Sequence, residues 1–257
     1  MSAPGDDGGA TAAPDLAHLA ELRAKIAARA VATALAGLVP LPIIDDLASE
    51  AARRSMLRMI AKARGIATTP GAIANLAVEV DAPTWRRLAT GAAVGSMLWR
   101  SLRKAVLVLT VLREADEAAR TFQIGTLFDH YCARMHPGGE LDAVSARLLR
   151  EVMTASMESV RREALKKTFR RGMLLALRTS ARVPIKLVSS FVRAVTGRGK
   201  GEAAVDAAVE AAEREGFVAK AARAITDEIT SSGSAFLGEL VDAFGSRWKL
   251  HQALAKK

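Results

Sequence analysis

The segment GLVPLPIIDDLA, residues 37–48, places two prolines one residue apart in an alanine-rich chain whose flanks have helical periodicity. Proline fixes its own φ and pushes the residue before it into extended geometry, so Pro40 and Pro42 end the preceding helix. Asp45 and Asp46 then fall in the first turn of the next helix, where the helix dipole favours carboxylates. The segment therefore predicts a sharp corner between two helices.

The corner is also apolar, since its remaining residues from 38 to 44 are leucine, valine and isoleucine. A continuous apolar surface of this kind is rarely left in contact with water. We therefore expect the corner either to be buried in the protein or to contact lipid or a partner.

Outward from this corner, the apolar periodicity predicts helices along the rest of the chain. Residues 71–80 also alternate as a strand would, but no convincing partner strand exists, so we interpret them as a short helix. Turns are expected at 136–139 and 197–201, where glycines cluster. The sequence predicts an all-α, alanine-rich multi-helix bundle. Its expected helices cover 15–38, 45–65, 71–80, 83–135, 141–179, 184–195, 202–215, 217–229 and a last segment after 234.

The chain of 257 residues is long enough for one large domain or two small ones. Residues 1–14 lack periodicity and any signal-peptide pattern, and they are expected to form a disordered tail. Residues 15–257 are expected to form the helical domain, either undivided or as subdomains 15–135 and 140–257. The single cysteine, Cys132, excludes an internal disulfide and is typical of a reducing cytoplasm.

The longest uncharged run, residues 30–44, contains both prolines of the corner. A membrane-spanning helix needs about 20 apolar residues, and this run is shorter. We therefore expect a buried helix of the bundle, with a hairpin that dips into one leaflet as the alternative.

One segment invites a metal hypothesis, FDHYCARMH at residues 128–136, which contains Asp129, His130, Cys132 and His136. Zinc ligands on one helix are usually three or four residues apart, whereas the two histidines are six apart. We interpret the segment as structural, with a buried cysteine and a histidine at a helix end. Phosphate-loop and nucleophile-elbow motifs do not occur in the chain. We expect no catalytic residue, no metal and no cofactor, and hence a protein that is not an enzyme.

Charge is the most informative property of the chain, whose net charge is +10. Residues 161–200 contain twelve arginines and lysines against one acid, Glu163. Over 161–171 the cations spread over a wide face opposite Leu165 and Phe169, which is the pattern of a basic amphipathic helix. Such helices bind membrane surfaces or partner grooves. The residues predicted to bind a membrane or a partner are Arg161, Arg162, Lys166, Lys167, Phe169, Arg170, Arg171, Arg178, Arg182, Lys186, Phe191 and Arg193.

Two other interpretations of residues 161–200 stay open. The cations could form a solvated face, paired with an acidic helix that carries Glu202, Asp206, Glu210 and Glu213. Nucleic acid could also bind through charge alone. However, Phe169 and Phe191 are the only aromatic residues here that could stack on bases, so we favour a membrane surface.

The sequence therefore predicts a non-enzymatic cytoplasmic protein that associates peripherally with anionic lipid on the inner face of the cell membrane. An unidentified protein partner is also expected. The alternative is a soluble helical scaffold that binds an acidic protein partner or nucleic acid. The oligomeric state does not follow from the sequence.

The corner and the stretch LRMIAKARGI that follows at 57–66 resemble the iPiPg-D signature of an uncharacterised helical domain family. That domain occurs in certain bacterial inner-membrane proteins and is appended to some Era-like and dynamin-like GTPases. The resemblance implies a helical hairpin that works at the membrane, with no known catalysis. Ile44 departs from the pattern, because the family tends to have a small residue there, and no GTPase module accompanies the segment. The matching positions are Pro40, Pro42, Asp45, Ile60 and Gly65.

Overall fold

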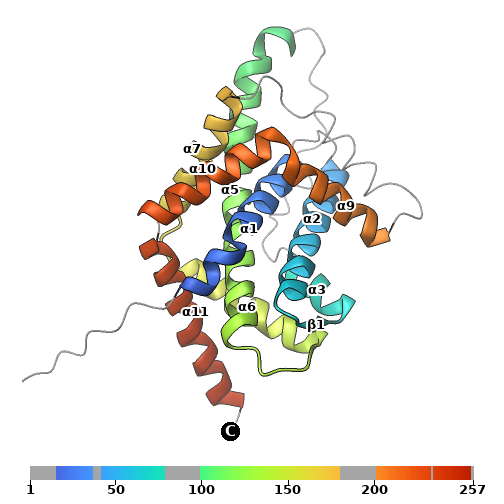
Figure 1. Cartoon of the computed structure of the whole chain (residues 1–257), viewed down its shortest axis with the longest axis vertical. Coiled ribbons are helices and arrows are strands. Elements are labelled where there is room, and N and C mark those ends of the chain that lie inside the picture. Colours follow the sequence, from blue (N-terminus) through green and yellow to red (C-terminus); the bar gives the residue numbers. More distant parts are fainter. Residues whose placement is uncertain (1–15, 37–41, 79–98, 180–200, 233, 256–257) are drawn as a thin grey trace, which may run out of the picture.

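The computed structural model describes residues 16–36, 42–78, 99–179, 201–232 and 234–255, and this part of the chain is all-α, which confirms the predicted fold class (Figure 1). Two dipeptides, β1 (Ala67–Thr68) and β2 (Glu140–Leu141), pair in parallel between the helices. The helices are α1 (Ala17–Ala36), α2 (Pro42–Ala63), α3 (Pro70–Ala77), α5 (Trp99–Arg134), α6 (Ala143–Ser159), α7 (Glu163–Thr179), α9 (Gly201–Arg214), α10 (Gly216–Ser232) and α11 (Ser234–Ala255).

Helix α5 is the central element, and α1 and α7 pack along it (Figure 1). Phe122 of α5 contacts Phe169 of α7 with ring centroids 5.4 Å apart, and Asp116 of α5 pairs with Arg170 of α7. Helix α10 packs against both α7 and α1, and α3 packs against α6. One hydrophobic cluster extends from Leu22 to Trp248 and joins side chains from both of the predicted subdomains.

Glycine allows two pairs of helices to approach closely, as a core poor in aromatic residues requires. A Cβ atom added at Gly125 of α5 would lie 2.7 Å from Cγ2 of Ile26 in α1. At Gly172 of α7, it would lie 2.5 Å from Cγ1 of Ile225 in α10. These glycines therefore set how closely α1 and α10 pack against the centre of the bundle.

Several predicted helix boundaries are confirmed. Gly65 follows α2 with φ +70°, a conformation that favours glycine at a helix end. The ambiguous segment after it is the helix α3, whose Pro70 is the first helical residue and whose Thr69 Oγ1 accepts a hydrogen bond from the Ala72 N–H at 3.1 Å. Gly138 and Gly139 form the expected turn, with φ values of +97° and +85°.

The predicted single helix over 141–179 is wrong, because the chain breaks between α6 and α7. Val160 is buried and extended, with φ −106° and ψ 143°. Two side chains donate hydrogen bonds to backbone carbonyl oxygens near the end of α6. Ser159 Oγ donates to the carbonyl oxygen of Ser156 at 2.8 Å, and Arg162 Nε donates to the carbonyl oxygen of Met157 at 2.8 Å. Neither glycine nor proline marks this break, which is why the helical periodicity did not reveal it.

The opening corner is described in part. Helix α2 begins at Pro42 rather than at the predicted Asp45, since proline is well suited to the first helical position. Residues 37–41, including Pro40, lie outside the described residues. Residues 30–35 of the long uncharged run are all buried in the bundle, as expected. Among the described residues, no helix is long and apolar enough to cross a membrane.

Candidate functional site

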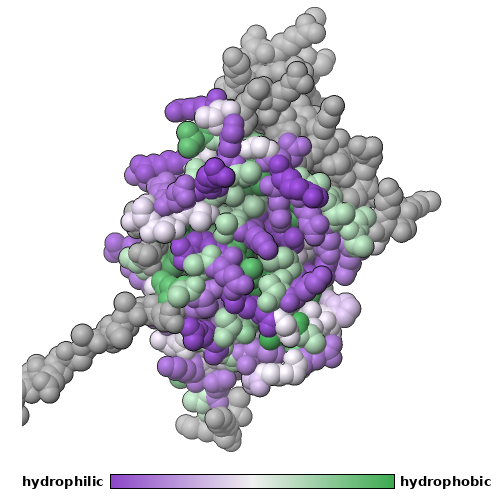
Figure 2. All heavy atoms as spheres, viewed as in Figure 1, coloured by the Kyte–Doolittle hydropathy of each residue, from purple (hydrophilic) through white to green (hydrophobic). Residues whose placement is uncertain are grey.

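Helix α7 carries the described part of the predicted binding stretch. Its amphipathic sequence places one face against α5 and α10 and leaves the other in solvent. The outward positions carry mainly charged side chains, and Figure 2 shows hydrophilic side chains over much of the visible described surface, with apolar ones in small separate areas. The buried face consists of Leu165, Thr168, Phe169, Gly172, Met173 and Ala176.

Phe169 is not a surface residue, and its predicted role in binding a membrane or partner is wrong. Its side chain is fully buried and packs against Phe122 of α5. An apolar helix face has the same sequence pattern whether it contacts the core or lipid. The apolar face of α7 is therefore already used inside the protein.

Four of the predicted cations on α7 and just before it have partners within the protein. Arg170 Nε and Nη2 donate to the two carboxylate oxygens of Asp116 in α5 at 3.0 and 2.7 Å, and this hydrogen bonding raises the pKa of Arg170. Arg171 pairs with Glu228 of α10 at 3.2 Å, and Lys166 pairs with Glu163 at 3.1 Å. The fourth, Arg162, caps α6. The ion pairs of Arg170 and Arg171 join α7 to α5 and α10, whereas that of Lys166 lies within α7.

The remaining predicted cations on α7 and just before it are available to a ligand. Arg161, Lys167 and Arg178 are exposed, and none of them makes a hydrogen bond or ion pair within the part of the chain that the structure describes. Lys167, Arg171 and Arg178 are four and seven residues apart in turn, so they form one stripe along the solvent side of the helix.

Two further residues, which the sequence did not reveal, belong to this stripe. Leu175 is 52% exposed and lies on the same side of the helix, four residues after Arg171. Lys220 of α10 donates to the backbone oxygen of Thr179 at 3.0 Å, so it brings another cation to the C-terminal end of α7. The helical spacing could have revealed Leu175, but Lys220 depends on tertiary contact. We define the α7 outer face as Lys167, Arg171, Leu175, Arg178 and Lys220.

The rest of the predicted binding stretch and corner is not placed by the structure. Arg182, Lys186, Phe191 and Arg193 lie outside the described residues, as does Pro40. Pro42, Asp45 and Asp46 lie in the first turns of α2.

Three of the four acids on the acidic helix have ion-pair partners outside the basic stretch, so the predicted pairing with that stretch is wrong for these three. Helix α9 instead contacts α1 and α2. Glu213 pairs with Arg29 of α1, and Glu202 and Asp206 pair with Arg58 of α2. The acids that do meet α7 are Asp116 of α5 and Glu228 of α10.

 
Asp116 is 54 residues from Arg170, and Glu228 is 57 residues from Arg171, so these contacts could not be found from local spacing.

The segment that suggested a metal site is instead a buried polar junction between α1, α2 and α5. Asp129 is fully buried and accepts hydrogen bonds from Arg64 Nε and Nη2 at 2.6 and 3.2 Å. His130 Nδ1 lies 2.9 Å from Nε2 of His18, and Arg64 Nη2 also donates to the His18 oxygen at 2.7 Å. The Asp129 carboxylate is therefore committed to an arginine, and within the described ranges no group of three or more His, Cys, Asp or Glu residues could hold a metal ion.

Burial also sets the protonation states at this junction. Desolvation, with a smaller effect of the His18 charge, lowers the pKa of His130 to about 4, so this imidazole is neutral at pH 7. Desolvation raises the pKa of Cys132 to about 12, which keeps the thiol protonated and unreactive. His136 lies in the following turn, 3.2 Å from the hydroxyl of Tyr131. These side chains have structural contacts that account for their positions.

Comparisons with protein families, with characterised proteins and with solved structures find no match to this chain. The resemblance of residues 37–65 to the iPiPg-D family therefore stays a prediction. A functional hypothesis for this protein has to rest on the geometry and charge of its described surface.

Proposed function

We propose that the protein associates peripherally with an anionic membrane surface through the α7 outer face. The observation that carries this proposal is the stripe of exposed cations on α7, in which Lys167 and Arg178 make no ion pair within the described residues. A lysine or arginine held near an anionic bilayer contributes about 1 kcal/mol, so a few such residues give weak, reversible and salt-sensitive binding.

The mode of association is adsorption rather than insertion of α7. To insert, the helix would have to withdraw its apolar face from α5 and α10, and each large side chain so removed would cost about 1.5–3 kcal/mol of burial. Leu175 is the one exposed large apolar side chain on α7 itself, and it lies beside Arg171 and Arg178. A single leucine adds modestly to the electrostatic attraction.

Nucleic acid fits the α7 outer face less well than lipid does. Proteins that bind single strands usually stack bases on exposed aromatic rings, and Phe169, the aromatic residue of α7, is buried. An acidic protein partner would use the same cations, and it remains the alternative that the experiment must separate.

Vesicle flotation tests the proposal. Vesicles of phosphatidylcholine with phosphatidylglycerol should carry the protein upward at low salt, whereas vesicles of phosphatidylcholine alone should not. The double substitution Lys167→Glu and Arg178→Glu should abolish this binding, because it replaces attraction by repulsion on the proposed face.

A matched control is needed because the whole chain is basic. Arg147→Glu with Lys249→Glu makes the same change in net charge at exposed positions on α6 and α11, and this variant should float like the parent. Equal binding by both double variants would mean that α7 is not the site. Failure to bind anionic vesicles together with a shift of DNA or RNA would replace the proposal by nucleic-acid binding.

A further inference from the structure

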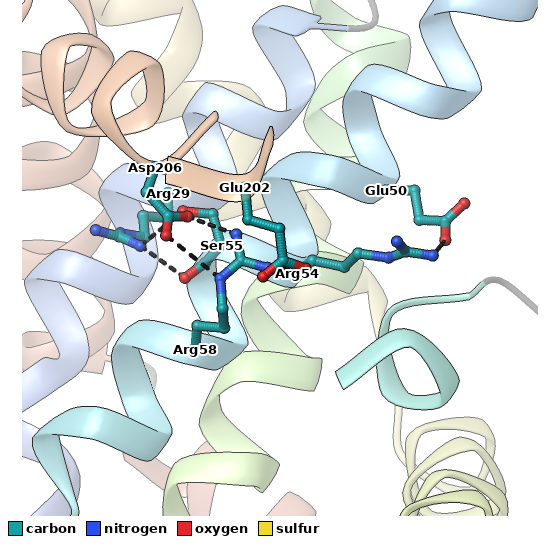
Figure 3. A network of polar contacts seen from close by, with 7 residues as sticks. All are labelled: Arg29, Glu50, Arg54, Ser55, Arg58, Glu202 and Asp206. Carbon is teal, nitrogen blue, oxygen red and sulfur yellow. Dashed lines mark hydrogen bonds and ion pairs between the residues drawn. The ribbon is translucent and has the colours of Figure 1, made fainter. Parts of the chain in front are cut away.

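Helix α9 packs on the face of α1 and α2, and ion pairs join it to both helices; Figure 3 shows the pairs made by Arg58. Arg58 donates from Nη2 and Nε to the two carboxylate oxygens of Asp206, at 2.6 and 3.3 Å, and its Nη1 lies 3.1 Å from Glu202 Oε1. Further along the helix, Glu213 pairs with Arg29. The acids lie four and seven residues apart in turn, so one side of α9 presents them all.

Arg29 of α1, one of the arginines under α9, is held in place by a residue of α2. Arg29 Nη1 donates to the backbone oxygen of Ser55 at 2.8 Å and lies 3.1 Å from its hydroxyl oxygen. Its side chain is only 6% exposed, so its direction is fixed by α2 as well as by Glu213. A carboxylate that approaches this position meets an oriented guanidinium, whether or not it belongs to α9.

The apolar contact under α9 is small and separate from the main core. Val205 and Val209 pack with Ala48 and Ala52 of α2 in one cluster, and Ala212 meets Ala32 of α1 in another. These are small side chains, so α9 buries little apolar surface compared with α7 or α10. The contact between α9 and the face beneath it therefore combines ion pairs with a small apolar area.

We propose that this α1–α2 face, with Arg29 and Arg58 at its centre, is a docking site for an acidic amphipathic helix. Helix α9 occupies the site in this structure, and the acidic helix of a protein partner replaces it. Such a helix carries carboxylates at the positions of Glu202, Asp206 and Glu213, with small apolar residues between them. This site requires no lipid and is independent of the α7 outer face.

The ion pairs at Arg58 are exposed to solvent, and this exposure favours the replacement of α9 by a partner helix. The side chains of Glu202 and Asp206 are 60% and 36% exposed, and exposed ion pairs contribute about 0–1 kcal/mol each. The same pairs form with a helix from another molecule, so the partner competes only against the tethering of α9 to its own chain.

The test uses a fluorescent, capped peptide of residues 201–214, whose helix content is measured in the assay buffer, and the full-length protein. Glu202→Gln, Asp206→Asn and Glu213→Gln together weaken the resident helix. This triple variant should bind the peptide at least about ten-fold more tightly than the parent does, because its site is open for a larger fraction of the time. Fluorescence anisotropy without lipid gives the dissociation constants.

The control separates this site from general basic charge. Arg58→Gln in the triple variant should remove peptide binding, whereas Arg54→Gln should leave it unchanged. Arg54 lies on the same helix, but it extends away from α9 and pairs with Glu50 (Figure 3). Equal effects of the two substitutions would overturn the proposal, as would the absence of binding by a helical peptide at millimolar concentration.

Hydrogen exchange of the parent protein is a second measurement. The amides of α9 should exchange through a local opening, faster than those of α1 and α2 beneath it. If the α9 amides exchange only as fast as global unfolding allows, the helix is a permanent part of the fold and the proposal fails. Neither measurement depends on membrane binding, so the two proposals can fail separately.

Discussion

At the scale of single residues, the fold depends on a few polar side chains buried where helices meet. Arg64 and Asp129 form an ion pair in which the acid is fully buried. Desolvation raises the pKa of Asp129 while the hydrogen bond from Arg64 lowers it, and the same bond raises the pKa of Arg64. The ion pair therefore offsets the desolvation cost of burying the Asp129 carboxylate, and it does not add net stability to a core that would be stable without it.

The first prediction concerns this pair. Arg64→Ala leaves the Asp129 carboxylate buried without its partner and should lower the free energy of unfolding by about 3–5 kcal/mol. Urea denaturation followed by circular dichroism measures the change. Arg54→Ala, which removes a partly exposed pair with Glu50, should cost less than about 1 kcal/mol. Equal losses in the two variants would contradict the assignment.

The second prediction concerns pH. The pKa of His130 in the folded protein is about 4, below the ordinary value of 6.5, so the unfolded chain takes up a proton first as the pH falls. The free energy of unfolding should therefore fall by about 2 kcal/mol between pH 7 and pH 5 because of this residue alone. Asp129 acts in the opposite sense, since a raised pKa favours proton uptake by the folded state.

A variant isolates the contribution of His130. His130→Gln cannot titrate in this range, so its free energy of unfolding should depend less on pH by about the same 2 kcal/mol. Denaturation at the two pH values, for the parent and the variant, gives the difference directly. Parallel pH profiles would show that burial does not shift the titration of His130.

At the scale of helices, the sequence predicted much of the fold but not which surfaces meet. The start of α2 at Pro42, the turn at Gly65 after α2 and the helix α3 follow from local backbone chemistry, which the sequence reveals. The break at Val160 depends on side-chain capping by Ser159 and Arg162, and it has no such local signal.

The two sides of α7 illustrate the same limit for the candidate site. The sequence pattern indicates that α7 is amphipathic. Whether Phe169 contacts lipid or Phe122, however, depends on α5, which lies far from it in the sequence. The acids that pair with Arg170 and Arg171 could be identified only from the three-dimensional contacts.

The third prediction distinguishes the two sides of α7. Phe169→Ala opens a cavity in the core and should lower the free energy of unfolding by about 3–5 kcal/mol. Leu175→Ala alters an exposed position and should change it by less than about 0.5 kcal/mol. Under adsorption, Leu175→Ala should also keep most of the vesicle binding. A loss of binding as large as that of Lys167→Glu with Arg178→Glu would instead indicate insertion.

At the scale of the whole molecule, the chain combines a net charge of +10 with a bundle whose helices use their apolar faces internally. Helix α7 lies toward one end of the molecule, and α6 and α11 lie toward the other (Figure 1). Because these helices lie at different ends, two variants of equal net charge can each remove positive charge from one end of the molecule. Comparing them tests which end binds the membrane.

The most direct test of the central claim is the salt dependence of vesicle binding for three proteins: the parent, Lys167→Glu with Arg178→Glu, and Arg147→Glu with Lys249→Glu. The account predicts strong binding of the parent and of the α6–α11 variant at low salt, falling steeply as the Debye length shrinks below about 10 Å. The α7 variant should show little binding at any salt concentration. Binding of all three proteins along the same salt curve would contradict the account, because the α7 outer face would then have no special role.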